Sequence, residues 1–170
     1  MHMKLAESLD FTRNVDKGAE IHGKWPISSL SGLSDLLLND QGDLDVSLYF
    51  GRQAKWSYVK GTVTGNLAVT CQRCMQPMEL ALDTQFSLAL VRNEDEADLL
   101  PEEFEPLMLE DEILSLSRLL EEELLLAIPL VAMHDTECSD VLVEQKQWQA
   151  ENESLHKKEN PFSVLKDLIK

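Results

Sequence analysis

The stretch Thr70–Pro77, with the sequence TCQRCMQP, separates two long runs of alternating apolar and polar residues, and it is the strongest indication of the fold. In the first run, the alternate positions on one side are Val63, Gly65, Leu67, Val69 and Cys71. In the second run, the alternate positions on one side include Met78, Leu80, Leu82, Phe86, Leu88 and Leu90. Such alternation is typical of strands that bury one face. The C-x-x-C piece is therefore predicted to form the tip of an antiparallel hairpin and not the start of a helix.

Further strands are predicted on the N-terminal side of this hairpin. Residues 43–91 together indicate a meander of three or four antiparallel strands, with a turn over Gly51–Ala54. Ala19–Trp25 predicts another strand. A proline at position 26, followed by apolar residues near helical spacing, predicts a short amphipathic helix over Ile27–Leu38.

A second helix is predicted to begin near Ser115 or Ser117, either of which can cap it, and to end at Pro129. Its broad apolar face carries Leu116, Leu119, Leu120, Leu124 and Ile128. A face of this kind packs against a sheet. The expected fold class is therefore α+β: an antiparallel β-meander with helices packed on one face and the C-x-x-C at a hairpin tip.

Length and composition limit the class of protein. The chain has 170 residues, of which 44% are hydrophobic, and this suits one domain over 1–170. We expect a core over about 19–133, an acidic loop over 92–106 and a loosely packed C-terminal tail over 139–170. No apolar run reaches the roughly eighteen residues of a membrane span. Three cysteines do not make a disulfide framework, so we expect a cytoplasmic protein that does not contact membranes.

The net charge of −16 arises from 15 basic and 31 acidic residues, and it is unevenly distributed. Residues 51–74 hold four bases and no acid, whereas residues 92–125 hold thirteen acids and two bases. A chain this acidic is repelled by phosphate backbones at long range. It should favour basic partners, and basic ribosomal proteins are one such class.

The cysteines predict a candidate metal site. Cys71 and Cys74 supply half of a tetrahedral zinc site, and the H-x-x-x-C of His134 and Cys138 would supply the other half. The alternative is that Cys71 packs inside the hairpin and the other thiols bind nothing. A redox pair is disfavoured, because reactive C-x-x-C pairs begin a helix whereas a strand follows here.

The basic stretch is a candidate RNA-binding surface. Cations interleaved with aromatic rings are what single-stranded RNA binding uses. The residues concerned are Arg52, Lys55, Trp56, Tyr58, Lys60 and Arg73. In the alternative interpretation the aromatic residues cover the sheet and the bases protect a strand edge.

The acidic stretch from Glu94 to Glu123 is a candidate docking surface for a basic partner. Thirteen acids in the surrounding segment exceed what solubility requires. The residues concerned are Glu102, Glu103, Glu105, Glu121 and Glu122. The alternative is a solubilising loop and a solvated helix face.

An enzyme is the least supported class. The sequence has no G-x-S-x-G, no phosphate-binding glycine loop and no H-E-x-x-H. None of its four histidines has a recognisable serine or cysteine motif as partner beyond Cys138. No catalytic residue is predicted.

The order of several pieces resembles the YceD family, the large ribosomal RNA subunit accumulation proteins. They are the CQRC hairpin with its following proline, Ala127–Val131 after an acidic leucine-rich helix, His134-Asp135 before Cys138, and Asn160–Leu165. The resemblance implies a role in making or retaining large-subunit ribosomal RNA, with no established catalytic chemistry. Members often carry further cysteines near the C-terminus, which favours a metal, but here only Cys138 is found there.

We therefore expect a non-catalytic factor that supports accumulation or processing of large-subunit ribosomal RNA, and hence ribosome assembly. It would bind a basic ribosomal protein, precursor ribosomal RNA, or both. Two alternatives stay open: a zinc-stabilised protein-interaction module with another partner, and an enzyme that processes ribosomal RNA.

Overall fold

The computed structural model describes residues 5–109, 111–139, 144 and 147–148. The chain divides into two compact units, Met1–Met133 and His134–Lys170. The tail expected over 139–170 lies almost wholly outside the described residues. The first unit contains, in order, β1 (Ser8–Asp10), α1 (Phe11–Lys17), β2 (Glu20–Pro26), the 3₁₀ turns η1 (Ile27–Ser29) and η2 (Ser31–Leu33), β3 (Asp43–Gln53), β4 (Trp56–Thr70), β5 (Pro77–Leu90), α2 (Glu94–Ala97), β6 (Glu105–Leu107), β7 (Ile113–Ser115) and α3 (Leu116–Ala127).

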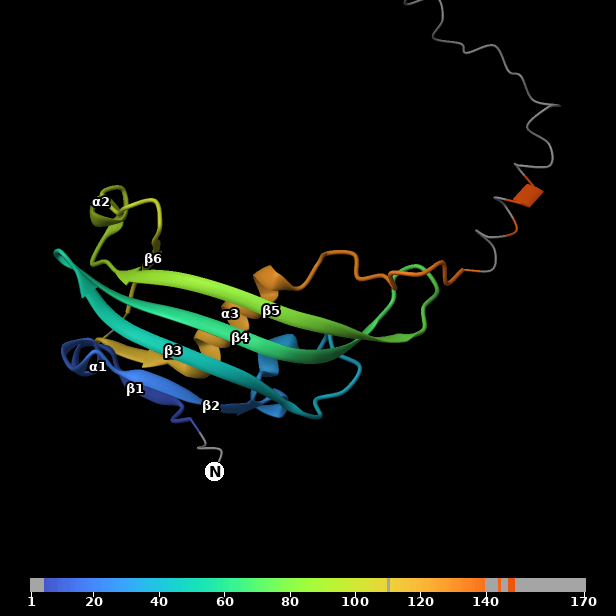
Figure 1. Cartoon of the computed structure of the whole chain (residues 1–170), viewed down its shortest axis with the longest axis horizontal. Helices are drawn as coiled ribbons and strands as arrows, with labels where there is room; N and C mark the ends of the chain where they lie inside the picture. The colour runs from blue at the N-terminus through green and yellow to red at the C-terminus, as the bar shows by residue number, and fades with distance from the viewer. Residues whose placement is uncertain (1–4, 110, 140–143, 145–146, 149–170) are drawn as a thin grey trace, which may run out of the picture. The chain divides into compact units, whose positions relative to one another are not determined.

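The first unit is built on a five-stranded sheet in the order β2-β3-β4-β5-β6, and this confirms the α+β meander (Figure 1). Neighbouring strands are antiparallel except for β6, which runs parallel to β5. Strands β1 and β7 pair separately as a two-stranded ribbon. The β4–β5 hairpin aligns Thr70 with Pro77, so the C-x-x-C lies at the hairpin tip as predicted.

One face of the sheet carries the main core. The β4 side chains Val59, Val63 and Leu67 point to this face and are fully buried there. Helix α1 packs on β3 and β4, and α3 packs on β5. The rings of Phe11 and Phe50 meet edge to face with centroids 5.8 Å apart. Because both helices use this face, the opposite face of the sheet keeps its polar residues exposed.

The segment Ile27–Leu38, predicted as an amphipathic helix, instead forms the two 3₁₀ turns η1 and η2, and this prediction was wrong. The buried side chains Ile27, Leu30 and Leu33 recur every three residues, which is the period of a 3₁₀ helix. The Leu30 and Leu33 amides accordingly donate to carbonyls three residues back, Leu30 to Ile27 at 2.9 Å and Leu33 to Leu30 at 3.1 Å. Several serines and a glycine in this segment also lower its α-helical propensity.

The turn predicted over Gly51–Ala54 is also displaced. Strand β3 continues to Gln53, which pairs with Trp56, so only Ala54 and Lys55 make the turn. Ala54 adopts the left-handed conformation, with φ of +53°. Tyr58 lies opposite Gly51, and its ring occupies the space that a side chain at Gly51 would need. This pairing keeps Gly51 in the strand.

The segment 92–106, expected to be an acidic loop, contains the single helical turn α2 and the beginning of β6. The Asn93 side chain caps α2 by accepting a hydrogen bond from the Glu96 amide at 2.9 Å. Phe104 anchors the segment in a small second core with Trp56, Ala89 and Val91. This core holds the acidic residues that flank Phe104 beside the polar face of the sheet.

The N-terminal elements β1 and α1 were not predicted. Helix α1 begins at Asp10, whose carboxylate accepts a hydrogen bond from the Arg13 amide at 2.8 Å. It ends at Gly18, which has the left-handed φ of +56° that favours glycine at this position. Within the described part of the chain, no helix combines the length and the apolar character needed to cross a bilayer.

Candidate functional site

The hairpin tip is a compact turn that brings its two cysteines together. The Cys71 amide donates to the Gln76 carbonyl, and the Met75 amide donates to the Cys71 carbonyl, both at 2.9 Å. Met75 takes a left-handed φ of +59°, which reverses the chain before β5. The Gln72 amide donates to the Ala132 carbonyl at 2.8 Å. The turn is therefore linked to the chain just before His134.

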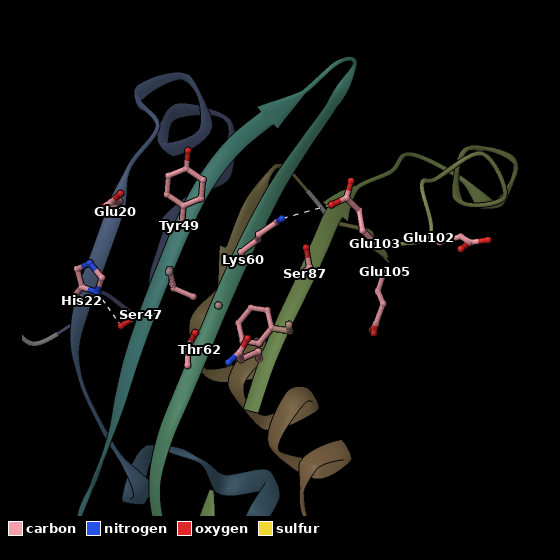
Figure 2. A pocket seen from close by; sticks show the side chains of 14 residues that line it. Glu20, His22, Ser47, Tyr49, Lys60, Thr62, Ser87, Glu102, Glu103 and Glu105 are labelled. Atoms are coloured by element: carbon pink, nitrogen blue, oxygen red, sulfur yellow. Dashed lines mark hydrogen bonds and ion pairs between the residues drawn. The ribbon is translucent and has the colours of Figure 1, made fainter. Parts of the chain in front are cut away.

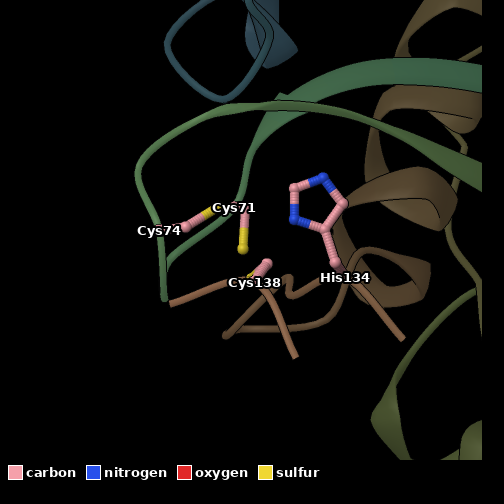
Figure 3. Close-up of side chains that lie close together, drawn as sticks. All are labelled: Cys71, Cys74, His134 and Cys138. Atoms are coloured by element: carbon pink, nitrogen blue, oxygen red, sulfur yellow. The ribbon is translucent and has the colours of Figure 1, made fainter. Parts of the chain in front are cut away.

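Four ligand-type side chains form a cluster at this tip, and Figure 3 shows them directed toward a common space. The sulfur atoms of Cys71, Cys74 and Cys138 and a ring nitrogen of His134 all lie within 4.8 Å of one another. Cys71 is buried, and the other three are half-buried. All three cysteines are free thiols in the structure. The cluster predicted from the sequence is thus assembled, and it could bind a metal such as zinc.

The donor set fits zinc on chemical grounds. Three thiolates and one imidazole are a common ligand set of structural zinc sites. Ligands about 2.3 Å from a tetrahedral ion lie roughly 3.8 Å from each other, which is compatible with donor atoms that all lie within 4.8 Å of one another. A strand and not a helix follows Cys74, whereas reactive redox C-x-x-C pairs begin a helix.

The predicted RNA-binding residues divide between the two ends of β4. Arg73 lies at the hairpin tip, whereas the other five lie at the β3–β4 end. Fifteen strand residues separate these ends, which is roughly 45–50 Å at about 3.3 Å per residue. The structure therefore does not bring the six residues together.

Each of the five residues at the β3–β4 end has a contact partner within the protein. Arg52 pairs with Asp16 of α1 at 3.1 Å. Trp56 is only 7% exposed, and the Lys55 ammonium lies 4.3 Å above its ring. The ring of Tyr58 packs on that of Phe104 with centroids 5.2 Å apart. Burial and its hydrogen bond with Tyr49 raise the pKa of Tyr58, so the phenol stays protonated.

The predicted docking acids also divide into two groups. Glu102, Glu103 and Glu105 lie beside the polar face of the sheet. Glu121 and Glu122 lie on α3, where Glu121 accepts a hydrogen bond from the Gly32 amide at 2.9 Å. Glu122 accepts one from Arg118 at 2.9 Å. The α3 acids therefore have intramolecular partners.

The polar face of the sheet carries a hollow that the sequence did not predict (Figure 2). It encloses about 680 Å³ and is lined by three groups from β2 and β3 that were not singled out, Glu20, His22 and Tyr49. His22 Nδ1 is 2.9 Å from Ser47 Oγ. The signal was present in the sequence, since these residues occupy the exposed parity of their strands. Only the strand order shows that these exposed residues share one hollow with the acids around β6.

Glu123 on α3 has a perturbed protonation equilibrium. Burial of its side chain, followed by the neighbouring Glu105 and Glu122 charges, raises the pKa of Glu123. The folded protein therefore binds a proton at this site more readily than the unfolded chain does. As pH rises through the interval between the ordinary glutamate value and the raised one, Glu123 reduces the stability of the fold.

Replacing Glu123 with glutamine should therefore raise the free energy of unfolding at pH 7, by less than about 1 kcal/mol for a partly exposed group. Urea unfolding of both proteins measures the difference. At pH 4, where Glu123 is mainly protonated, we expect the difference to shrink toward zero. A difference that is unchanged between the two pH values would contradict the raised pKa.

The fold and the cluster define an acidic α+β protein with a Cys₃His centre at the tip of its longest sheet hairpin. The family model of the large ribosomal RNA subunit accumulation protein YceD matches residues 59–169. The large ribosomal RNA subunit accumulation protein YceD of Haemophilus influenzae is 33% identical over 169 residues, covering 98% of this chain and 97% of that protein. The chain belongs to the YceD family. No solved structure matches it.

Proposed function

We propose that this protein supports the accumulation of large-subunit ribosomal RNA as a non-catalytic factor that binds a basic ribosomal protein. The family name links its members to large-subunit ribosomal RNA, and it is not the name of an enzyme. The observation that carries the proposal is the distribution of charge. Glu102 and Glu105, which flank Phe104, are exposed and have no ion pair among the described residues. Arg52 and Lys60 of the basic stretch are paired with Asp16 and Glu103.

Binding to a basic protein agrees with this electrostatic arrangement. A net charge of −16 attracts a basic protein and repels a phosphate backbone beyond the first contacts. Trp56 has little exposed ring surface on which a base could stack. Direct contact with precursor RNA is therefore the less supported route, and the experiment below distinguishes the two.

The full-length protein should capture basic large-subunit ribosomal proteins from a cell extract treated with ribonuclease. Mass spectrometry identifies the proteins, and sequencing of an untreated sample identifies bound RNA. Raising the salt concentration from low to moderate should weaken the capture, because exposed charge pairs are screened. Deleting the gene should also lower the ratio of large-subunit to small-subunit ribosomal RNA.

The control is the variant R52S/K55S/K60S, which removes cations but no acid. It should capture the same proteins as the wild type or bind them more tightly. Two results together would identify RNA, and not a basic protein, as the partner. The wild type would capture no ribosomal protein after ribonuclease treatment, and it would bind RNA that R52S/K55S/K60S does not bind. Release of shortened RNA by the purified protein would contradict the non-catalytic role.

A further inference from the structure

We infer that the hollow on the polar face of the sheet binds an extended peptide segment that carries two basic side chains about six residues apart. This inference rests on the proposed function and names its site. Figure 2 shows the hollow between Glu20 on β2 and the acidic residues around β6. It lies on the face of the sheet opposite α1 and α3, and its surroundings are polar.

The floor of the hollow follows the register of the sheet. One row across the strands consists of Glu20, Tyr49, Lys60 and Ser87, and the next consists of His22, Ser47, Thr62 and Gln85. The Lys60 ammonium lies between the edge strands and the His22 imidazole lies on β2, and the other polar groups of these rows between the edges are mostly hydroxyls and an amide. Such groups can donate or accept hydrogen bonds to the backbone of an extended segment without selecting its sequence. The floor therefore suits a peptide and sets no strong side-chain preference at its centre.

The carboxylates stand at the two edges of the floor, and the Lys60 ammonium lies between them on β4. Glu20 lies on the edge strand β2, and Glu105 begins the opposite edge strand β6, with Glu102 and Glu103 just before it. These four carboxylates and the single ammonium group of Lys60 give the lining a net charge of −3 with His22 neutral. Within the described residues, Glu20, Glu102 and Glu105 take part in no ion pair. Their charges are therefore available to a cationic partner.

The sheet fixes the spacing of the two carboxylate edges. Four strand intervals lie between β2 and β6, which amounts to about 19 Å at roughly 4.8 Å per interval. An extended chain covers this distance in about six residues at roughly 3.3 Å each. A segment that crosses the strands can therefore place one lysine or arginine at Glu20 and another at Glu105.

An aromatic ring adds a second preference for a cation. Tyr49 projects from β3 within the hollow and is 42% exposed. A guanidinium or ammonium group that approaches Glu20 from the floor passes the face of this ring and gains a cation–π contact. Nucleic acid is disfavoured at the same place, because its phosphates would meet the carboxylates at both edges.

The experiment measures binding of a fluorescein-labelled, otherwise uncharged peptide with two lysines about six residues apart, by anisotropy at low salt. The full-length wild type should bind it at least about fivefold more tightly than a peptide of the same composition with adjacent lysines. The E20Q/E105Q variant should bind the spaced peptide about fivefold to tenfold more weakly than the wild type, because two screened rim contacts are lost.

The matched control is D35N/D40N, which removes the same number of charges from the exposed segment between η2 and β3. It should bind within about twofold of the wild type, since these carboxylates do not line the hollow. Equal binding by E20Q/E105Q and D35N/D40N would overturn the inference. Tighter binding of a single-stranded RNA oligomer than of the spaced peptide by the wild type would also overturn it. If the wild type captures basic ribosomal proteins and E20Q/E105Q captures them equally well, the hollow is excluded and the proposed function stands. If the wild type captures none, the proposed function itself fails.

Discussion

Replacing Cys74 with serine is expected to lower the affinity of the protein for Zn²⁺ by at least about a hundredfold, because loss of a group that only hydrogen-bonds to a metal ligand already costs about 10–100-fold. Cys74 is half-buried and lies in the turn, so a serine hydroxyl at this position can be solvated. Cys71 is fully buried, and a serine there would add a folding defect to the loss of the ligand. Cys74 therefore gives the cleaner test of the Cys₃His centre.

Metal content per chain and competition with a chromophoric chelator measure this effect. Replacing His134 with glutamine should have a similar effect, since it removes another of the four donors. Gln76→Ala is the matched control in the same turn, and it should retain the wild-type affinity. Zinc affinity should also fall as the pH is lowered, because protons compete for thiolate and imidazole ligands. Undiminished zinc binding by both the Cys74 and His134 variants would contradict a centre built from these residues.

Replacing Gly61 with alanine is expected to destabilise the fold by about 1–3 kcal/mol, the usual cost of inserting a methyl group into a packed core. Gly61 on β4 pairs with Phe86 on β5, and the phenyl ring lies across the glycine. A methyl group added at Gly61 would be 2.0 Å from the nearest ring carbon. The ring is almost fully buried and has little room to move.

The sign of this effect should depend on Phe86. In a Phe86→Leu background the ring is absent, and Gly61→Ala should become neutral or stabilise the fold by up to about 1 kcal/mol, because glycine inside a strand is unfavourable. Urea unfolding of the four proteins completes the double-mutant cycle. Thr62→Ala, on the polar side of the same strand, is the matched control and should change the stability by less than about 1 kcal/mol. An equal penalty for Gly61→Ala in both backgrounds would show that the ring does not cause it.

Much of the sheet was predictable because its signal is local. The alternation on both sides of Cys71 and Cys74 fixes which residues of β4 and β5 face the core, since a shift of one residue would expose all of them. The helix α3 was predictable for a similar reason, because its apolar residues lie on one face and Pro129 follows it. The segment Ile27–Leu38 shows the limit of such patterns, since spacings of three and of 3.6 residues are hard to distinguish over three turns.

The candidate metal centre was predicted from ligand type and spacing, but the sequence alone left half of it unplaced. Cys71 and Cys74 are joined by a short turn, and their proximity follows from that turn. His134 and Cys138 come sixty and more positions later, and only the folded chain brings their donor atoms within 4.8 Å of the first pair. Spacing cannot encode that approach, because it depends on how the segment after α3 returns to the hairpin tip.

The predicted surfaces also show that distance along the sequence and distance in the fold differ. Arg73 and Arg52 are both cations of one basic stretch in the sequence, yet a fifteen-residue strand holds them at opposite ends of a hairpin. Glu20 and Glu105 are distant in the sequence, yet the strand order places them at the two edges of one hollow.

Four properties follow from the sequence alone: the α+β class, the C-x-x-C hairpin, the apolar face of α3 and the excess of acid. These properties depend on local periodicity and composition, and each can be seen within a short window of residues. The paired charges, the covered aromatic rings and the position of the polar hollow are known only from the folded structure. Those properties depend on the order of strands in the sheet and on contacts between distant segments, and a local pattern carries no information about either.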